Sequence, residues 1–100
     1  MNEYIIFMFN DATNQAASED DTLWSEYISK LRQTGQFDGG SSIGGGERFR
    51  KGQATKSAIT EISGFIRVRA DCVEAAKNLL VGNPAYEAGA SIDIRELIKE

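Results

Sequence analysis

The chain has 100 residues, 41% hydrophobic and 26% charged, which is enough for one domain with a modest core and too apolar for wholesale disorder. Its net charge of -4 argues against a nucleic-acid-binding protein, which needs a basic face. No apolar run approaches a membrane span, and no secretory leader is visible, so we expect no contact with a membrane. A single cysteine cannot form an internal disulfide, which suits a reducing compartment, and we expect a cytoplasmic protein.

The chain contains no histidine, and this excludes several classes of active site. Ser-His-Asp triads, Cys-His pairs and histidine-based metal sites are all ruled out. Only carboxylates remain as metal ligands and no EF-hand spacing is present, so we expect no metal and no cofactor. Acid-base chemistry would depend on Asp, Glu, Tyr or Lys.

The first third of the chain predicts a strand and a helix. Residues 4–9 form a short apolar run, typical of a strand that is buried on both faces, and residues 10–17 are a polar surface connection. Residues 18–21, Ser-Glu-Asp-Asp, then supply the acidic groups that favour a helix start, and Gly35 ends the helix. The apolar stripe of this helix consists of Leu23, Trp24, Tyr27, Ile28 and Leu31.

A glycine-rich segment follows the first helix. Seven of the ten glycines lie between residues 35 and 52: Gly35, Gly39, Gly40, Gly44, Gly45, Gly46 and Gly52. We expect short, irregular strands and a mobile hairpin here, which residues 53–60 could complete. Gly44-Gly45-Gly46 does not fit a phosphate loop, because the Lys-Ser/Thr of that motif is absent and no helix start follows.

The last part of the chain predicts a strand, a helix and a final strand. Residues 64–71 alternate between two kinds of side chain, as a strand between two different surroundings does. Asp71 and Glu74 have the spacing of a capping box, with Asp71 as the N-cap, and Cys72 is expected to be a small core residue. The helix is expected to end at Gly82, followed by a loop over residues 83–89 and a strand over residues 91–95.

The predicted order βαββαβ indicates an α+β, ferredoxin-like fold in one domain spanning residues 1–100. Its first and third strands would lie in the middle of a four-stranded antiparallel sheet, with two helices on one face. Ile66, Val68, Ala70, Ile92 and Ile94 would face the helices, whereas Phe65, Arg67, Arg69, Asp93 and Arg95 would lie on the other face.

The uncovered face predicts a homodimer. Two or three large apolar side chains of residues 4–9 must point away from the helices, and leaving them in water forfeits several kcal/mol, at about 1.5–3 kcal/mol for each side chain buried. A second copy packed sheet to sheet would cover them. The alternative is that residues 35–60 fold over this face.

A small-molecule site is predicted on the same face. Arg67, Arg69, Asp93 and Arg95 could line a cleft for an anion, with Phe65 and Tyr4 as apolar walls. The alternative is that these charges pair across strands. Asp38 and Tyr86 are candidates for an acid, a base or a ligand contact, and the alternative for each is a turn or packing role.

Several stretches together resemble the YCII-related (DGPF-type) family of small dimeric α+β barrel proteins. They are residues 4–9, Gly39-Gly40, Gly64-Phe65 leading into a helix, and residues 89–97 with Ser91-Ile92-Asp93-Ile94-Arg95. The resemblance implies a ferredoxin-like protomer and a dimer whose two sheets enclose a cleft. Residues 53–61 lack the Asp-Gly-Pro-Phe signature, and the histidine of the catalytic pair proposed in related proteins is absent, so no activity is carried over.

The sequence therefore favours a homodimer that binds a small, anionic molecule and has no recognisable catalytic motif. One alternative is a small lyase or isomerase that uses Asp38 or Tyr86 for proton transfer. Another is a regulatory or structural interaction module, which would be indicated by a cleft filled with side chains.

Overall fold

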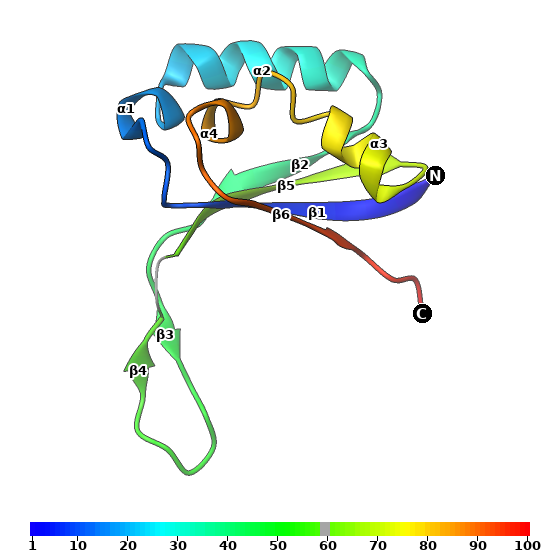
Figure 1. Ribbon diagram of the computed structural model, residues 1–100. Coiled ribbons are helices and arrows are strands. Elements are labelled where there is room, and N and C mark those ends of the chain that lie inside the picture. Colours follow the sequence, from blue (N-terminus) through cyan, green and yellow to red (C-terminus); the bar gives the residue numbers. More distant parts are fainter. Residues whose placement is uncertain (59–60) are drawn as a thin grey trace.

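A computed structural model describes residues 1–58 and 61–100 and shows an α+β protein (Figure 1). A four-stranded antiparallel sheet has the order β2-β5-β1-β6, which is compatible with a ferredoxin-like arrangement, and the helices cover one of its faces. The strands of this sheet are β1 (Asn2–Phe9), β2 (Phe37–Ser42), β5 (Ile62–Ala70) and β6 (Ile92–Glu96). The helices are α1 (Gln15–Ser18), α2 (Asp21–Gln33), α3 (Val73–Asn78) and α4 (Pro84–Glu87).

The central strands β1 and β5 build the sheet side of the core. Tyr4 pairs with Val68 and Ile6 with Ile66, and all four side chains are buried beneath the helices. Ile92 and Ile94 of β6 pack against this cluster, as the alternation of the last strand predicts. The core contains the residues Tyr4, Ile6, Met8, Tyr27, Leu31, Ile66, Val68, Ala70, Ala76, Leu80, Ala85 and Ala90.

Helix α2 forms as the sequence predicts. The Asp20 side chain accepts a hydrogen bond from the backbone N–H of Leu23, which caps the helix start, and Gly35 follows the helix end with a φ of 73°. Tyr27 and Leu31 are buried, and the Tyr27 hydroxyl donates to the carbonyl of Leu79 at 2.7 Å. The apolar stripe therefore attaches α2 to the segment after α3.

Two short helices lie where the sequence predicted connections. The Asn14 side chain accepts from the N–H of Ala17 at the start of α1, within the expected surface connection. In α4, Asn83 accepts from the N–H of Tyr86 and Pro84 occupies the first turn, so the expected loop over residues 83–89 is wrong. Asn83 is fully buried, and this side chain therefore holds α4 against the core.

The predicted role of Cys72 is wrong. The N-cap of α3 is Cys72 rather than Asp71, and the Cys72 sulfur accepts from the N–H of Ala75 at 3.4 Å. This places the thiol outside the first turn of the helix, where it is exposed and not part of the core. The apolar stripe of the helix includes Ala75, which packs against the core, and Ala76, which is buried.

The glycine-rich segment contributes an edge strand and a projecting hairpin. In β2 the register shifts between Phe37 and Gly40, so that Asp38 and Gly39 form a bulge against β5. The hairpin of β3 (Glu47–Arg48) and β4 (Lys56–Ser57) extends away from the sheet and does not fold over its uncovered face (Figure 1). The predicted completion of this hairpin by residues 53–60 includes Ile59 and Thr60, which lie outside the described residues.

Candidate functional site

The sheet face opposite the helices is termed here the open face. It carries alternate residues of each strand: Glu3, Ile5, Phe7 and Phe9 of β1, Asp38 and Ser41 of β2, Phe65, Arg67 and Arg69 of β5, and Asp93 and Arg95 of β6. Five of these were predicted on this face from the sequence. The three large apolar side chains of β1 are only half-buried, as the alternation in burial along that strand shows.

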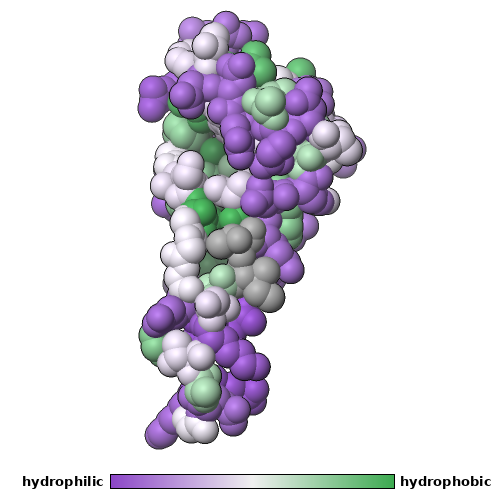
Figure 2. Space-filling model, turned by 90° about the vertical axis from the view of Figure 1, so that its left-hand side faces the viewer, coloured by the Kyte–Doolittle hydropathy of each residue, from purple (hydrophilic) through white to green (hydrophobic). Residues whose placement is uncertain are grey.

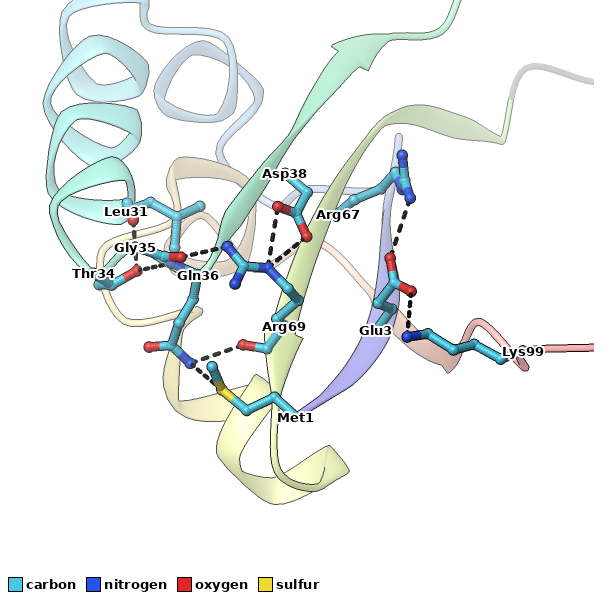
Figure 3. Close-up of polar contacts among 10 residues, drawn as sticks. All are labelled: Met1, Glu3, Leu31, Thr34, Gly35, Gln36, Asp38, Arg67, Arg69 and Lys99. Atoms are coloured by element: carbon cyan, nitrogen blue, oxygen red, sulfur yellow. Dashed lines mark hydrogen bonds and ion pairs between the residues drawn. The ribbon is translucent and has the colours of Figure 1, made fainter.

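Arg69 is occupied by contacts within the protein (Figure 3). Its Nε–H is shared between the two carboxylate oxygens of Asp38, at 2.9 and 3.2 Å, and its Nη2 donates to the carbonyl of Gly35. The backbone carbonyl of Gln36 accepts a hydrogen bond from the backbone N–H of Arg69 at 2.8 Å. The side-chain amide of Gln36 donates a hydrogen bond to the backbone carbonyl of Arg69 at 2.8 Å. Arg69 therefore fixes the turn between α2 and β2 and is a poor candidate for holding a ligand.

Arg67 has a weaker partner. One of its terminal nitrogens lies 3.6 Å from a carboxylate oxygen of Glu3, and the side chain of Arg67 is 44% exposed (Figure 3). The other oxygen of Glu3 lies 3.9 Å from the ammonium of Lys99. Solvent-exposed pairs at such distances contribute little to stability, about 0–1 kcal/mol. Arg67 can therefore turn toward another anion at a small cost.

Arg67 and Arg95 lie on either side of one apolar residue. Ile5 of β1 pairs with Arg67 on β5 and with Arg95 on β6, so the three side chains form one row across the open face. Arg95 is exposed and forms no ion pair with any residue that the structure describes. Two guanidinium groups beside an apolar surface can bind a carboxylate or phosphate through paired hydrogen bonds.

The neighbouring row is more apolar. Phe7 pairs with Phe65 on one side and with Asp93 on the other, and both aromatic side chains are half-buried. In the adjacent strand, Ser41 pairs with Phe65 and completes the row. Pockets for small molecules commonly combine such apolar walls with a few charged groups. The open face thus brings together Phe65, Arg67, Asp93 and Arg95, as predicted.

Two predicted site residues are not part of this arrangement. Tyr4 is only 1% exposed and faces the helices, because it pairs with Val68 in the core register, so its predicted role as a wall of the open-face site is wrong. Tyr86 lies in α4, in the helix layer, whereas Asp38 lies on the open face (Figure 1). The sheet separates them, and they cannot share one acid-base site.

A pronounced carboxylate interaction lies away from the open face, near the start of β6. Asp11 accepts hydrogen bonds from the hydroxyl of Ser91 at 2.5 Å and from its backbone N–H at 2.8 Å. These hydrogen bonds, the hydroxyl first, lower the pKa of Asp11 because they stabilise the ionised carboxylate. In the core, burial raises the pKa of Tyr27 because the phenolate would lose its hydration. Both residues are structural.

A second candidate site, which the sequence did not predict, lies between α2 and the sheet. This α2 cavity has a volume of about 550 Å³. Its lining residues are Met8, Gln15, Ser18, Glu19, Asp21, Trp24, Ile28, Arg32, Phe37, Gly40, Ser41, Ser42, Ser63, Gly64, Phe65 and Ile66. Apolar atoms are visible in a hollow on the side of the molecule shown in Figure 2, between the helices and the β3–β4 hairpin.

The described residues contain neither a membrane-spanning helix nor a metal-binding cluster. No helix in the described part of the chain has the length and apolar character needed to cross a membrane. Across residues 1–58 and 61–100, no cluster of three or more His, Cys, Asp or Glu side chains is arranged to hold a metal ion.

Comparisons with protein-family models and with curated proteins find no match to this chain.

Proposed function

We propose that two copies of this chain pack open face to open face and bind a small anionic molecule in the cleft between their sheets. In this proposal the protomer is ferredoxin-like, the dimer is an α+β barrel of the YCII-related kind, and the protein works in the cytoplasm. The observation that carries the proposal is the row in which Arg67 and Arg95 flank Ile5 on a sheet face that no helix covers.

Apolar area supports the dimer. Ile5, Phe7 and Phe65 are half-buried in the single chain, and each would gain from further burial, at roughly 25 cal/mol per Å² of apolar surface removed from water. Sheets that pack face to face place such side chains between them. A two-fold axis would bring the same patch onto itself, as closed dimers require.

Charge supports an anionic ligand. Each open face offers Arg67, with only a distant partner at 3.6 Å, and Arg95, which has no ion pair with the described residues. A face-to-face dimer would place four such guanidinium groups around one cleft. Neutralisation of these charges by a bound carboxylate or phosphate would remove the repulsion between them.

The β3–β4 hairpin gives further support. It extends from the sheet on the side of the open face (Figure 1), and its Phe49 is 74% exposed. In a face-to-face dimer this hairpin would lie beside the partner, which could cover Phe49. Coverage of Phe49 by the partner would remove its apolar surface from water and so would favour the dimer.

Light scattering tests the dimer. We expect a mass near twice the 11.0 kDa of one chain at micromolar concentration, and a shift toward the monomer in Phe7→Lys. Val81→Lys is the matched control, because Val81 is 77% exposed but lies in the helix layer. Far-UV circular dichroism verifies that both variants are folded. A monomeric wild type, or equal masses for wild type and Phe7→Lys, would contradict the dimer.

Calorimetric titration with succinate and inorganic phosphate tests the ligand class. We expect binding by the wild type, a loss of roughly tenfold or more in Arg95→Gln, and no change in Lys77→Gln, which lies on α3 in the helix layer. If the dimer forms but neither anion binds, the chain is a structural or regulatory interaction module instead, and the ligand part of the proposal fails.

A further inference from the structure

The α2 cavity is a second site, between α2 and the sheet, and it shares only Ser41 and Phe65 with the open face. We propose that it binds a small monocarboxylate with an apolar body, the carboxylate lying at Arg32 and the body against Trp24 and Ile28. This site is complete within one chain. It therefore does not depend on the dimer or on the cleft proposed above.

Five of the nine sheet residues that line the cavity are glycine or serine: Gly40, Ser41, Ser42, Ser63 and Gly64. Gly40 pairs with Ile66 and Ser42 pairs with Gly64, so three of the four residues in these two pairs are glycine or serine. Gly40 cannot be larger, since a Cβ there would lie 2.3 Å from the carbonyl oxygen of Phe65. The resulting volume of about 550 Å³ is within the range of small-molecule pockets, about 300–1,000 Å³.

The walls of the cavity are apolar and held in place. Trp24, Ile28 and Phe37 are only half-buried although they border the core. The Trp24 indole N–H donates to the carbonyl of Ser18 at 2.7 Å, and its ring meets Tyr27 edge to face at 5.9 Å. Met8 is buried and also lines the cavity. An apolar ligand body would complete the burial of these side chains without moving them.

Arg32 supplies the charge at one end. Its guanidinium carbon lies 5.9 Å from the centre of the Phe37 ring, which holds the group beside the cavity. Within the described part of the chain Arg32 forms no ion pair, so its hydrogen-bond donors face solvent. A planar guanidinium group matches the two oxygens of a carboxylate.

The other end of the cavity excludes a second negative charge. Glu19 and Asp21, at the junction of α1 and α2, both line it. The Glu19 carboxylate accepts a hydrogen bond from the side-chain amide of Gln15 at 3.0 Å. Like charges repel, so a dicarboxylate or an inorganic phosphate that extends toward this end would be disfavoured. The ligand class is therefore a carboxylic acid with one charge.

Trp24 makes the test direct, because it is the only tryptophan in the chain and lines the cavity. We would titrate the protein with 4-phenylbutyrate, with the neutral 4-phenylbutanol and with the dianion phenylsuccinate, and follow tryptophan fluorescence. We expect 4-phenylbutyrate to change the emission and to bind at least about tenfold more tightly than either comparator, the gain expected for hydrogen bonds to a charged group.

Four variants locate the site. Arg32→Gln should weaken 4-phenylbutyrate about tenfold and leave 4-phenylbutanol unchanged, whereas Arg48→Gln on the hairpin should affect neither. Ser42→Phe should fill the cavity and abolish binding of both, with circular dichroism verifying the fold. Arg95→Gln should leave this titration unchanged, which separates it from the open-face proposal. The inference is overturned if no probe binds, if the alcohol binds as tightly as the acid, or if Arg32→Gln has no effect.

Discussion

Both carboxylate oxygens of Asp38 accept the Nε–H of Arg69, at 2.9 and 3.2 Å, and this pair joins β2 to β5 across the open face. Arg69 also donates to the carbonyl of Gly35, at the end of α2. One side chain thus connects the helix end, the edge strand and a central strand. Its role is to hold the edge of the sheet in place.

Replacement of Arg69 by Gln should lower the free energy of unfolding by about 1–2 kcal/mol. A partly exposed ion pair contributes up to about 1 kcal/mol, and the hydrogen bond to the Gly35 carbonyl contributes about 1 kcal/mol more. Urea unfolding measures the difference. The control is Lys77→Gln, whose ion pair with Glu74 is more exposed and should contribute nothing measurable. Equal effects of the two substitutions would show that Arg69 has no structural role.

Replacement of Gly40 by Ala should destabilise the protein by about 2 kcal/mol or more, because the new Cβ would lie 2.3 Å from the Phe65 carbonyl oxygen, so β2 would have to move. Gly44→Ala is the matched control, since a Cβ at Gly44 meets nothing within 4 Å. It should change the free energy of unfolding by less than about 0.5 kcal/mol. A Gly40→Ala protein as stable as Gly44→Ala would disprove the close approach of β2 and β5.

Replacement of Cys72 by Ser should stabilise α3. Serine is among the preferred N-cap residues, and its hydroxyl accepts a hydrogen bond better than the sulfur, which lies 3.4 Å from the N–H of Ala75. We expect the free energy of unfolding, measured by thermal unfolding, to rise by about 0.5–1 kcal/mol in Cys72→Ser and to fall in Cys72→Ala. Because Cys72 is exposed, a thiol reagent should also modify one group per native chain without denaturant. A thiol that reacts only after unfolding would contradict this cap.

The Asp11–Ser91 contact should make stability depend on acid pH. The pKa of Asp11 is lowered in the folded protein, so its contribution is present above the unfolded pKa of about 3.9 and is lost as the pH falls through the folded pKa. Asp11→Asn should therefore be less stable than wild type at neutral pH, and this difference should shrink below the unfolded pKa. Ser91→Ala should behave alike. Urea unfolding over this range measures both, and a difference that does not vary with pH would refute the assignment.

The main strands and α2 were predictable because their side chains alternate with the period of one element. In residues 64–71 charged and apolar residues alternate, so the sequence predicts that Arg67 and Arg69 lie on the sheet face opposite the helices. In residues 4–9 every side chain is apolar, and the sequence does not say which ones face the helices. Tyr4 pairs with Val68, which faces the helices, so Tyr4 faces them too. This register joins residues far apart in the sequence, and for this reason the predicted place of Tyr4 on the open face is wrong.

The short helices and the α2 cavity could not be predicted for a different reason. Helices α1 and α4 have only four residues each, too few to show a period, and they depend on the capping side chains of Asn14 and Asn83. The cavity is lined by Gly40 of β2 and Gly64 of β5, which are far apart in the sequence and are brought to one site only by the pairing of these two strands. The glycine content of residues 35–52 predicts irregular strands, and it does not by itself indicate a cavity.

The bulge at Asp38 and Gly39 has a consequence for assembly beyond the placement of Asp38. Strand β2 forms one edge of the sheet, and regular edges recruit strands from other molecules into aggregates. The shift in register and the φ of 97° at Gly39 break the even spacing of free backbone groups along this edge. An incoming strand would meet an interrupted ladder, so lateral growth of the sheet at the β2 edge is disfavoured.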